Sequence, residues 1–529
     1  MALPNFFPRA AQSLRQVLRV SDIDFLPQRL EQSPIALVFD DGALAMANTS
    51  DTLHLAANLL ARLYPKIAVL HQGGRSDGRT LQEKLRERMR AINPDVELLD
   101  TTDGTKAALC LGHASVSDGI RIGIQSDSWN VEVGSGRPVS VLQGTVPNPF
   151  SAAAAACFGV AEIFHAVFGD VFPQEPNPTG VREDHYVLSL LDYTGTPSPQ
   201  EGLPPIHFED LSLVGLGAVG NAVVWTLGHI PNLTGKVHVI DHEDVELSNL
   251  QRYVLADQSS VEKPKTEIAK RILGGSGMEV FAFCQKFGDY VRDHRPGNKF
   301  ETIAISVDNI PDRLAAQAVL PRLIMNAWTS EEDAGWLGAS RHWFGGPNGC
   351  LACVYLPKMK RKSDTELIAD ATGLGHDVVK QLVAAGRPLT KELLARIAKA
   401  RRCPESILSE WEGKTLSEFY EKAVCGGVFL SYAPDKSRKH ELFVPLAHQS
   451  ALAGVLLAAE LVKQALGFVS PEDPPEIRIN ALFPPPEYVL FSRKKSYDPK
   501  CICTDDIYLG VYNEKYALTG KEKFTVSLS

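Results

Sequence analysis

Residues 211–220 read LSLVGLGAVG, and residues 236–252 read KVHVIDHEDVELSNLQR. The first stretch is a continuous apolar run, typical of a buried parallel strand, and it ends in a GxGxxG pattern at Gly215, Gly217 and Gly220. Glycines at this spacing allow a tight turn into a helix whose N-terminus favours an anionic phosphate. The stretch therefore predicts a strand, a nucleotide-binding loop and a helix.

The residues around this loop alternate between strand and helix patterns. After the strand KVHVI come a helical pattern in KPKTEIAKRIL (263–273) and two further strands, MEVFAF (278–283) and TIAIS (302–306). Such a βαβ series predicts an α/β fold, a doubly wound and Rossmann-like parallel sheet, which binds ligands outside the carboxyl ends of its strands.

The polar run after KVHVI separates two classes of enzyme. An NAD-dependent oxidoreductase explains the glycines and Asp241, but it holds its pyrophosphate with backbone amides and needs no cluster of charged side chains. An enzyme that cleaves ATP between the α- and β-phosphates needs donors around the phosphates and a carboxylate to hold Mg²⁺. Asn249, Arg252 and Lys265 are such donors, and Asp308 follows a strand at the same predicted edge.

These residues, in this order and at this spacing, resemble the ThiF/MoeB/HesA family, which includes the ubiquitin-activating enzymes. The resemblance implies that Asp241 binds the ribose of ATP, that Asn249, Arg252 and Lys265 contact the triphosphate, and that Asp308 holds Mg²⁺. One departure is Tyr253, where family members often carry Gln. The family also supplies an arginine to ATP from the partner half, for which Arg9 and Arg15 are candidates.

The N-terminal 200 residues resemble a degenerate repeat of the same pattern of strands and helices. KIAVLH (66–71) aligns with KVHVID (236–241), so that His71 stands opposite Asp241, and the turn after IALVFDD (35–41) keeps only Gly42. VPNPFSAAAAACFGVAEIFHAVFG (146–169) aligns without a gap with VPLAHQSALAGVLLAAELVKQALG (444–467). We therefore expect a duplicated fold, a pseudo-dimer of two homologous halves.

The resemblance divides the chain into five parts. They are an inactive adenylation-like domain (1–200), the first part of the active ThiF-like adenylation domain (205–356), a helical catalytic-cysteine insertion (357–430), the second part of the adenylation domain with a zinc-binding end (440–505) and a tail (506–529).

The cysteines suggest a metal site and a nucleophile. Cys350 and Cys353 form CxxC, and Cys501 and Cys503 form CxC, two close pairs that suit a structural Zn²⁺, as relatives have in corresponding places.

A thioester-forming enzyme also needs an accessible thiolate. Cys425, followed by two glycines, is the preferred candidate. Cys403 is the second, because Pro404 and two arginines beside it suggest a helix N-terminus and a lowered pKa, and the absence of any catalytic cysteine is the third interpretation. The patterns around Cys110, Cys157 and Cys284 predict core residues.

The expected function is that of a ubiquitin-like modifier activating enzyme. It would use Mg²⁺ and ATP to adenylate the C-terminal glycine of a ubiquitin-like protein, take it as a thioester and transfer it to a conjugating enzyme. The compact build resembles activating enzymes of bacterial ubiquitin-like conjugation systems, some linked to antiviral defence. The alternatives are an adenylyltransferase for a sulfur-carrier protein, an oxidoreductase and a non-enzymatic scaffold. A homodimer is possible.

Composition narrows the partners and the location. The 54 basic and 63 acidic residues give a net charge of −9, which argues against a nucleic-acid or anionic-membrane binder. No apolar stretch reads as long as the roughly 18–20 residues of a membrane span. Nine cysteines in 529 residues fit reduced thiols, so a cytoplasmic protein is expected.

Overall fold

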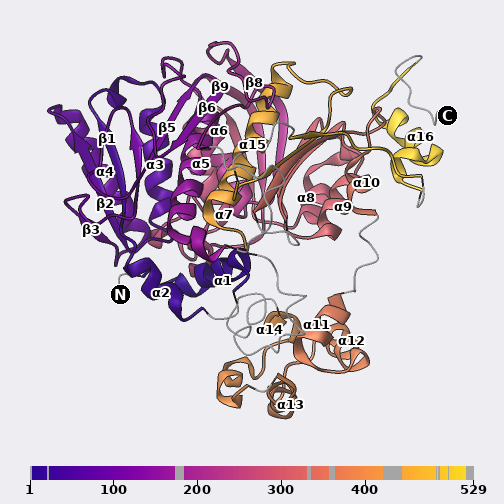
Figure 1. The fold of residues 1–529 in the computed structure, drawn as a ribbon. Helices are drawn as coiled ribbons and strands as arrows, with labels where there is room; N and C mark the ends of the chain where they lie inside the picture. The colour runs from indigo at the N-terminus through magenta and orange to yellow at the C-terminus, as the bar shows by residue number, and fades with distance from the viewer. Residues whose placement is uncertain are drawn as a thin grey trace.

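The computed structural model describes residues 3–20, 23–172, 184–330, 335–356, 364–401, 403–420, 444–483, 485, 489–497 and 500–519. Within these residues two sheets form, one in each half of the chain (Figure 1). The first has the order β3-β2-β1-β4-β5-β6-β7. Its strands are β1 (Ile35–Asp40), β2 (Lys66–Gln72), β3 (Glu97–Leu99), β4 (Ala107–Leu111), β5 (Ile120–Asp127), β6 (Asn130–Ser135) and β7 (His185–Ser189).

The second sheet has the order β10-β9-β8-β11-β12-β13-β14-β15. Its strands are β8 (Ile206–Val214), β9 (Leu233–Ile240), β10 (Glu279–Phe283), β11 (Thr302–Ile305), β12 (Leu323–Thr329), β13 (Trp336–Trp343), β14 (Glu476–Asn480) and β15 (Leu490–Phe491). The glycine stretch thus lies at the end of β8, the strand between β9 and β11, as the sequence predicts.

The two sheets repeat one plan. In each, the first five strands of the order run parallel and the following pairs are antiparallel. The matched helices are α3 (Thr49–Leu60) with α6 (Ala218–Gly228), α4 (Ser76–Ile92) with α7 (Lys265–Leu273), and α5 (Pro149–Phe168) with α15 (Ala447–Ala465). Because α5 and α15 begin at aligned positions of the two repeated stretches, the predicted duplication is confirmed.

The junction between the halves is a layer of apolar helices. Helices α5, α6 and α15 pack on one another, and one continuous hydrophobic core includes residues from both halves. By length and composition the helix at Pro149–Val171 could cross a membrane, which the sequence analysis did not expect, but 83% of its most apolar window is buried inside the protein. Its apolar surface is therefore covered, on one side by α3 and the strands of its own sheet and on the other by α15 of the opposite half.

A small helical module lies apart from the two sheets (Figure 1). It comprises α11 (Asp364–Thr372), α12 (His376–Ala385), α13 (Lys391–Arg401) and α14 (Leu416–Phe419), around its own core of residues such as Val379, Ile397 and Phe419. The predicted helical insertion is thus present in the described part of this region.

The remaining helices border the sheets. They are α1 (Phe7–Leu18), α2 (Phe25–Glu31), α8 (Phe287–His294), α9 (Ile310–Ala318), α10 (Leu351–Tyr355) and α16 (Asp506–Lys515). The segment expected as a tail therefore begins with a helix. Tyr512 of α16 and Tyr516 directly after it are buried in a cluster with Phe344 and the paired cysteines, which packs this segment against the second half.

Candidate active site and metal centre

The loop between β8 and α6 needs glycine at two of the three marked positions, Gly215 and Gly220. Gly215 has a φ of +85°, in the left-handed region, and a Cβ there would lie 2.9 Å from Cγ1 of Val307. Gly217 is the N-cap of α6, and a Cβ on Gly220 would lie 2.2 Å from the carbonyl oxygen of Gly215. The helix therefore approaches the strand closely, with its first backbone N–H groups at the carboxyl edge of the sheet, where phosphates bind in such folds.

Asp241 follows β9 and contacts this loop directly. Its carboxylate accepts the N–H of Leu216 at 2.6 Å and the N–H of Glu243 at 2.9 Å, and the residue is buried. Each carboxylate oxygen has a second lone pair, so both can still accept a hydroxyl proton from a ribose. The geometry holds Asp241 beside the glycine loop, as the ribose-binding role requires.

Lys265 and Arg252 lie around Tyr253. The Nζ atom of Lys265 is 5.3 Å from the centre of the Tyr253 ring, and the Arg252 guanidinium carbon is 5.7 Å from it. Lys265 also forms an ion pair with Glu243. Burial by itself lowers the pKa of Lys265, but electrostatic interactions with Tyr253, Asp241 and Glu243 outweigh it and raise the pKa above its ordinary value. Lys265 is therefore a permanent cation at neutral pH.

Tyr253, the residue that departs from the family pattern, lies beside the glycine loop. Tyr253 is buried, and a Cβ on Gly217 would lie 3.7 Å from its hydroxyl oxygen. An aromatic face next to two cations is favourable in a partly desolvated place. Tyr253 therefore lies next to Gly217 and to both cations.

Asn249 lies in a short 3₁₀ turn, η3 (Leu247–Gln251). Its side-chain oxygen accepts the N–H of Glu246 at 3.0 Å, which closes a capping box at the start of the turn. Helix α1, which carries the candidate arginines Arg9 and Arg15, contacts this turn. The supply of an arginine to ATP by either residue stays a prediction.

Asp308 is exposed and follows β11 at the same edge of the sheet. Asn309 caps α9, because its side-chain oxygen accepts the N–H of Asp312 at 2.8 Å, and its amide nitrogen lies 3.3 Å from Oδ1 of Asp308. Ser306 donates to the carbonyl oxygen of Gly215 at 2.7 Å, which joins the end of β11 to the glycine loop. An exposed carboxylate beside a phosphate loop suits a Mg²⁺ ligand.

One positioning residue escaped the sequence analysis. Arg313 is buried, and its guanidinium donates to the carbonyl oxygen of Val307 and to the side chain of Asn326, as well as to the carbonyl oxygen of Ala327 at 3.2 Å. It fixes the residue that precedes Asp308 onto β12. A charged residue three positions before Ala316, on the face of α9 that is buried, is the signal that could have indicated it.

The matching edge of the first sheet is built differently. Strands β1 and β8 pair with their neighbours in the same register, so that Asp40 and Asp41 occupy the positions of Leu216 and Gly217. His71, opposite Asp241 in the alignment, lies 2.8 Å from Asp41. Hydrogen bonds from Gly74 and His71 keep the pKa of Asp41 below its ordinary value, although burial opposes them. Two carboxylates at this position would repel a triphosphate.

The four paired cysteines meet in one place. Cys350, Cys353, Cys501 and Cys503 are buried, and their sulfur atoms lie within 4.8 Å of one another. Sulfur–sulfur distances are 3.5 Å between Cys350 and Cys501 and 3.4 Å between Cys353 and Cys503. A tetrahedral zinc with zinc–sulfur bonds of about 2.3 Å needs separations of about 3.8 Å.

The chemistry of this donor set also fits zinc. The N–H of Ser496 donates to the sulfur of Cys353 at 3.3 Å. The hydrogen bonds from Cys350 and the other thiols, together with that of Ser496, lower the pKa of Cys353. The arrangement fits a closed structural zinc site that would join α10 to the segment before α16.

The other described cysteines differ from expectation in two cases. Cys284 is exposed rather than in the core, because it follows β10, an edge strand whose residues are at most half-buried. Cys403 is buried in the core of the helical module, and burial raises its pKa, so the predicted lowering is wrong. Its N–H donates to Ala398 at the C-terminal end of α13, where the helix dipole would disfavour a thiolate. Cys425 lies outside the described residues.

Cys110 and Cys157 are core residues, as predicted. Burial raises the pKa of Cys110 to about 11 and also raises that of Cys157. Residues 38–169, all of which the structure describes, therefore contain no exposed thiol.

The duplicated Rossmann-like fold and the edge residues together define an adenylation fold. Residues 198–496, more than half of the chain, match the model of the ThiF family, and the chain belongs to this family. Residues 38–169 match the model described as Prokaryotic E2 family C. An uncharacterised protein of Sinorhizobium fredii, y4jF, is 37% identical over 527 residues, which cover 98% of both chains.

Solved structures of MccB from E. coli are also similar. A complex with AMPCPP and MccA shares 17% identity with a TM-score of 0.31, and covers 54% of this chain and 65% of that chain. A complex with succinimide shares 16% identity with a TM-score of 0.30 and the same coverage. The chain thus spans somewhat less than two thirds of MccB. Membership of the ThiF family supports ATP-dependent adenylation of a protein or peptide C-terminus, with ATP and Mg²⁺ as the groups required.

Proposed function

We propose that the protein activates the C-terminal glycine of a ubiquitin-like protein. A carboxylate oxygen of that glycine attacks the α-phosphorus of ATP, the bond to the β-phosphate oxygen breaks, and pyrophosphate leaves. A cysteine thiolate then attacks the carbonyl carbon of the acyl-adenylate, AMP leaves, and a thioester forms. Transfer of the acyl group to the thiol of a conjugating enzyme regenerates the cysteine.

The observation that carries this proposal is that a glycine loop, acidic side chains and a lysine lie together at one edge of the second sheet. The glycine loop, Asp241, Lys265 and Asp308 all lie at the carboxyl ends of adjacent parallel strands or in the segments that follow them. In this arrangement Arg252 and Lys265 stabilise the charge that develops on the leaving pyrophosphate. Asp308 would hold Mg²⁺, which neutralises phosphate charge when bound.

The N-terminal half would then be an inactive partner. Its equivalent loop carries Asp40 and Asp41, which accept backbone N–H groups from Ala43 and Gly74 and so occupy donors that a phosphate would otherwise use. With its described thiols buried, this half is not proposed to carry the thioester. We assign that role to Cys425, in the segment between α14 and α15.

Pyrophosphate exchange tests the adenylation step without a knowledge of later partners. With Mg²⁺, labelled pyrophosphate and a modifier ending in Gly-Gly, the protein should return label to ATP, and Asp308→Ala should abolish this exchange. Asp293→Ala is the matched control, since this carboxylate pairs only with surface Arg292 among the described contacts. Equal exchange by Asp308→Ala and the wild type would contradict the assignment of the metal ligand.

Analysis of the products distinguishes a sulfur-carrier adenylyltransferase from an enzyme that forms a thioester. AMP formation with no protein-bound modifier, using the cognate modifier, would favour a sulfur-carrier adenylyltransferase. A reductant-labile adduct would favour the conjugation reaction.

A further inference from the structure

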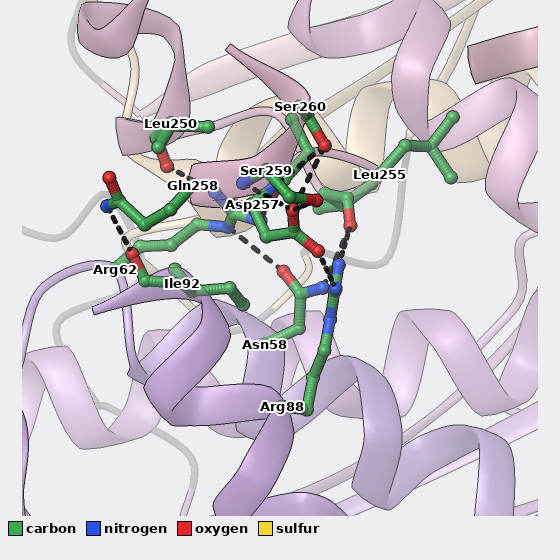
Figure 2. Close-up of polar contacts among 12 residues, drawn as sticks. Asn58, Arg62, Arg88, Ile92, Leu250, Leu255, Asp257, Gln258, Ser259 and Ser260 are labelled. Carbon is green, nitrogen blue, oxygen red and sulfur yellow. Dashed lines mark hydrogen bonds and ion pairs between the residues drawn. The ribbon is translucent and has the colours of Figure 1, made fainter. Parts of the chain in front are cut away.

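The segment 250–257, which contains Arg252 and Tyr253, is held by side chains from the opposite half (Figure 2). Arg62, just after α3, donates to the carbonyl oxygen of Leu250 and to that of Ala256 at 2.9 Å. Asn58 donates to the carbonyl oxygen of Val254 at 2.8 Å. The backbone is therefore fixed on both sides of Arg252 and Tyr253.

Burial of the Arg62 guanidinium at this junction is unfavourable unless its N–H groups are hydrogen-bonded. Arg62 is 1% exposed, and its side chain is held by Asn58, whose oxygen accepts its Nε–H at 2.9 Å. Burial lowers the pKa of Arg62, and the nearby charge of Arg88 adds to this effect. A buried guanidinium is retained only where its donors are satisfied, and those of Arg62 are satisfied largely by backbone carbonyls of the other half.

A second contact fixes the end of the same segment. Arg88 on α4 forms an ion pair with Asp257 at 2.7 Å, and Asp257 in turn accepts the N–H of Ser259 at 3.0 Å (Figure 2). Gln258 donates to the carbonyl oxygen of Ile92 at 2.8 Å. The first half thus contacts segment 250–257 and the turn after it through polar groups rather than through apolar packing alone.

The contact is one-sided, although the halves share one plan. The alignment of KIAVLH with KVHVID places Gly228 opposite Asn58 and Asn232 opposite Arg62. Gly228 has no side chain, and Asn232 is exposed. The second half therefore has no equivalent arginine directed at the first half, which matches the presence of phosphate-binding side chains on one sheet edge only.

We propose that Arg62 is a positioning residue of the nucleotide site, through which the N-terminal half holds Arg252 and Tyr253 in place for ATP. This inference rests on the proposed function. It gives the inactive half a defined role, because without the carbonyl contacts of Arg62 the segment that carries Arg252 is free to move away from the phosphates. By linkage, ATP binding then stabilises the contact between the halves.

The test compares two buried arginines by ATP-dependent pyrophosphate exchange in the full chain. Arg62→Met removes the carbonyl contacts, whereas Arg62→Lys keeps a charge that can reach one carbonyl. Arg86→Met is the control, because Arg86 is also buried and bonds the carbonyl oxygen of Leu99 at 3.1 Å, but only within the first half. Thermal unfolding with and without Mg·ATP is measured on each variant.

We expect Arg62→Met to raise the KM for ATP at least tenfold, Arg62→Lys to restore part of it, and Arg86→Met to leave it within twofold of the wild type. The stabilisation by Mg·ATP should shrink in Arg62→Met only. A normal KM in Arg62→Met, with a lower unfolding temperature, would overturn the inference. If Arg62→Met does not fold, Asn58→Ala decides instead, by the same KM criterion. Wild-type protein without exchange would instead contradict the proposed function.

Discussion

The ammonium group of Lys265 forms an ion pair with the carboxylate of Glu243, and this pair joins the start of α7 to the turn that follows β9. Lys265 is 4% exposed, and its Nζ atom lies 5.3 Å from the centre of the Tyr253 ring, which is next to Gly217 of the glycine loop. A fixed cation stabilises a leaving pyrophosphate more than a mobile surface lysine does, because it needs no reorganisation during the reaction.

Lys265→Met should therefore lower the rate of pyrophosphate exchange by about 10²–10³-fold, the usual cost of losing one fixed charge-stabilising donor. Lys270→Met, exposed on the same helix, should leave the rate unchanged. Since the pKa of Lys265 is raised, exchange should show no loss from its deprotonation below about pH 10. Equal rates for the two variants would contradict the phosphate-contacting role.

The cysteine cluster predicts one zinc ion per chain. Metal analysis of the purified protein should find it, and Cys350→Ser or Cys501→Ser should lose it together with several degrees of thermal stability, because α16 is joined to the core there. Cys284→Ser serves as control, since this thiol is exposed and far in sequence from the cluster. Full metal content in both cluster variants would refute the site.

Buried histidines predict how stability depends on pH. Burial, with the nearby charge of His165, lowers the pKa of His448 to about 3, and burial lowers the pKa of His238 to about 4. The unfolded chain therefore binds more protons than the folded one between these values and about 6.5. Stability should fall as the pH drops below about 6.5, by up to about 1.4 kcal/mol per unit for each histidine.

Replacement of one histidine should flatten this dependence. His448→Gln removes a group that must stay neutral between α5 and α15, so its urea unfolding should show a smaller decrease from pH 7 to pH 5 than that of the wild type. His376→Gln, exposed in the helical module, should keep the wild-type slope. Parallel curves for all three proteins would show that His448 does not titrate on unfolding.

Local pattern predicted most of the second half, because its determinants lie close together in the chain. Gly215, Asp241 and Asp308 each follow an apolar strand, and parallel strands bring their carboxyl ends to one edge whatever the loops between them do. The ungapped match of the two alanine-rich helices likewise predicted the repeat. These inferences needed only periodicity and topology.

The contacts that fix the site were not predictable in this way. Arg62 and Leu250 are 188 residues apart, and nothing in either local sequence indicates that a guanidinium meets a carbonyl. Cys284 was misplaced because the local pattern does not show that β10 is an edge strand, only half-buried, so that the residue after it is exposed. The sequence analysis also found no apolar stretch of membrane-spanning length, whereas the helix at Pro149–Val171 has that length and composition and is a buried core helix.

The nucleophile assignment gives the sharpest separation of the two chemical steps. Cys425 lies outside the described residues, so its support is the two glycines that follow it and the raised pKa of Cys403, its rival. Cys425→Ala should retain pyrophosphate exchange, which needs no thiol, and lose the reductant-labile adduct with the modifier in mass spectrometry. Cys403→Ala should retain both. An adduct that persists in Cys425→Ala, or one that vanishes in Cys403→Ala in a folded protein, would reassign the nucleophile.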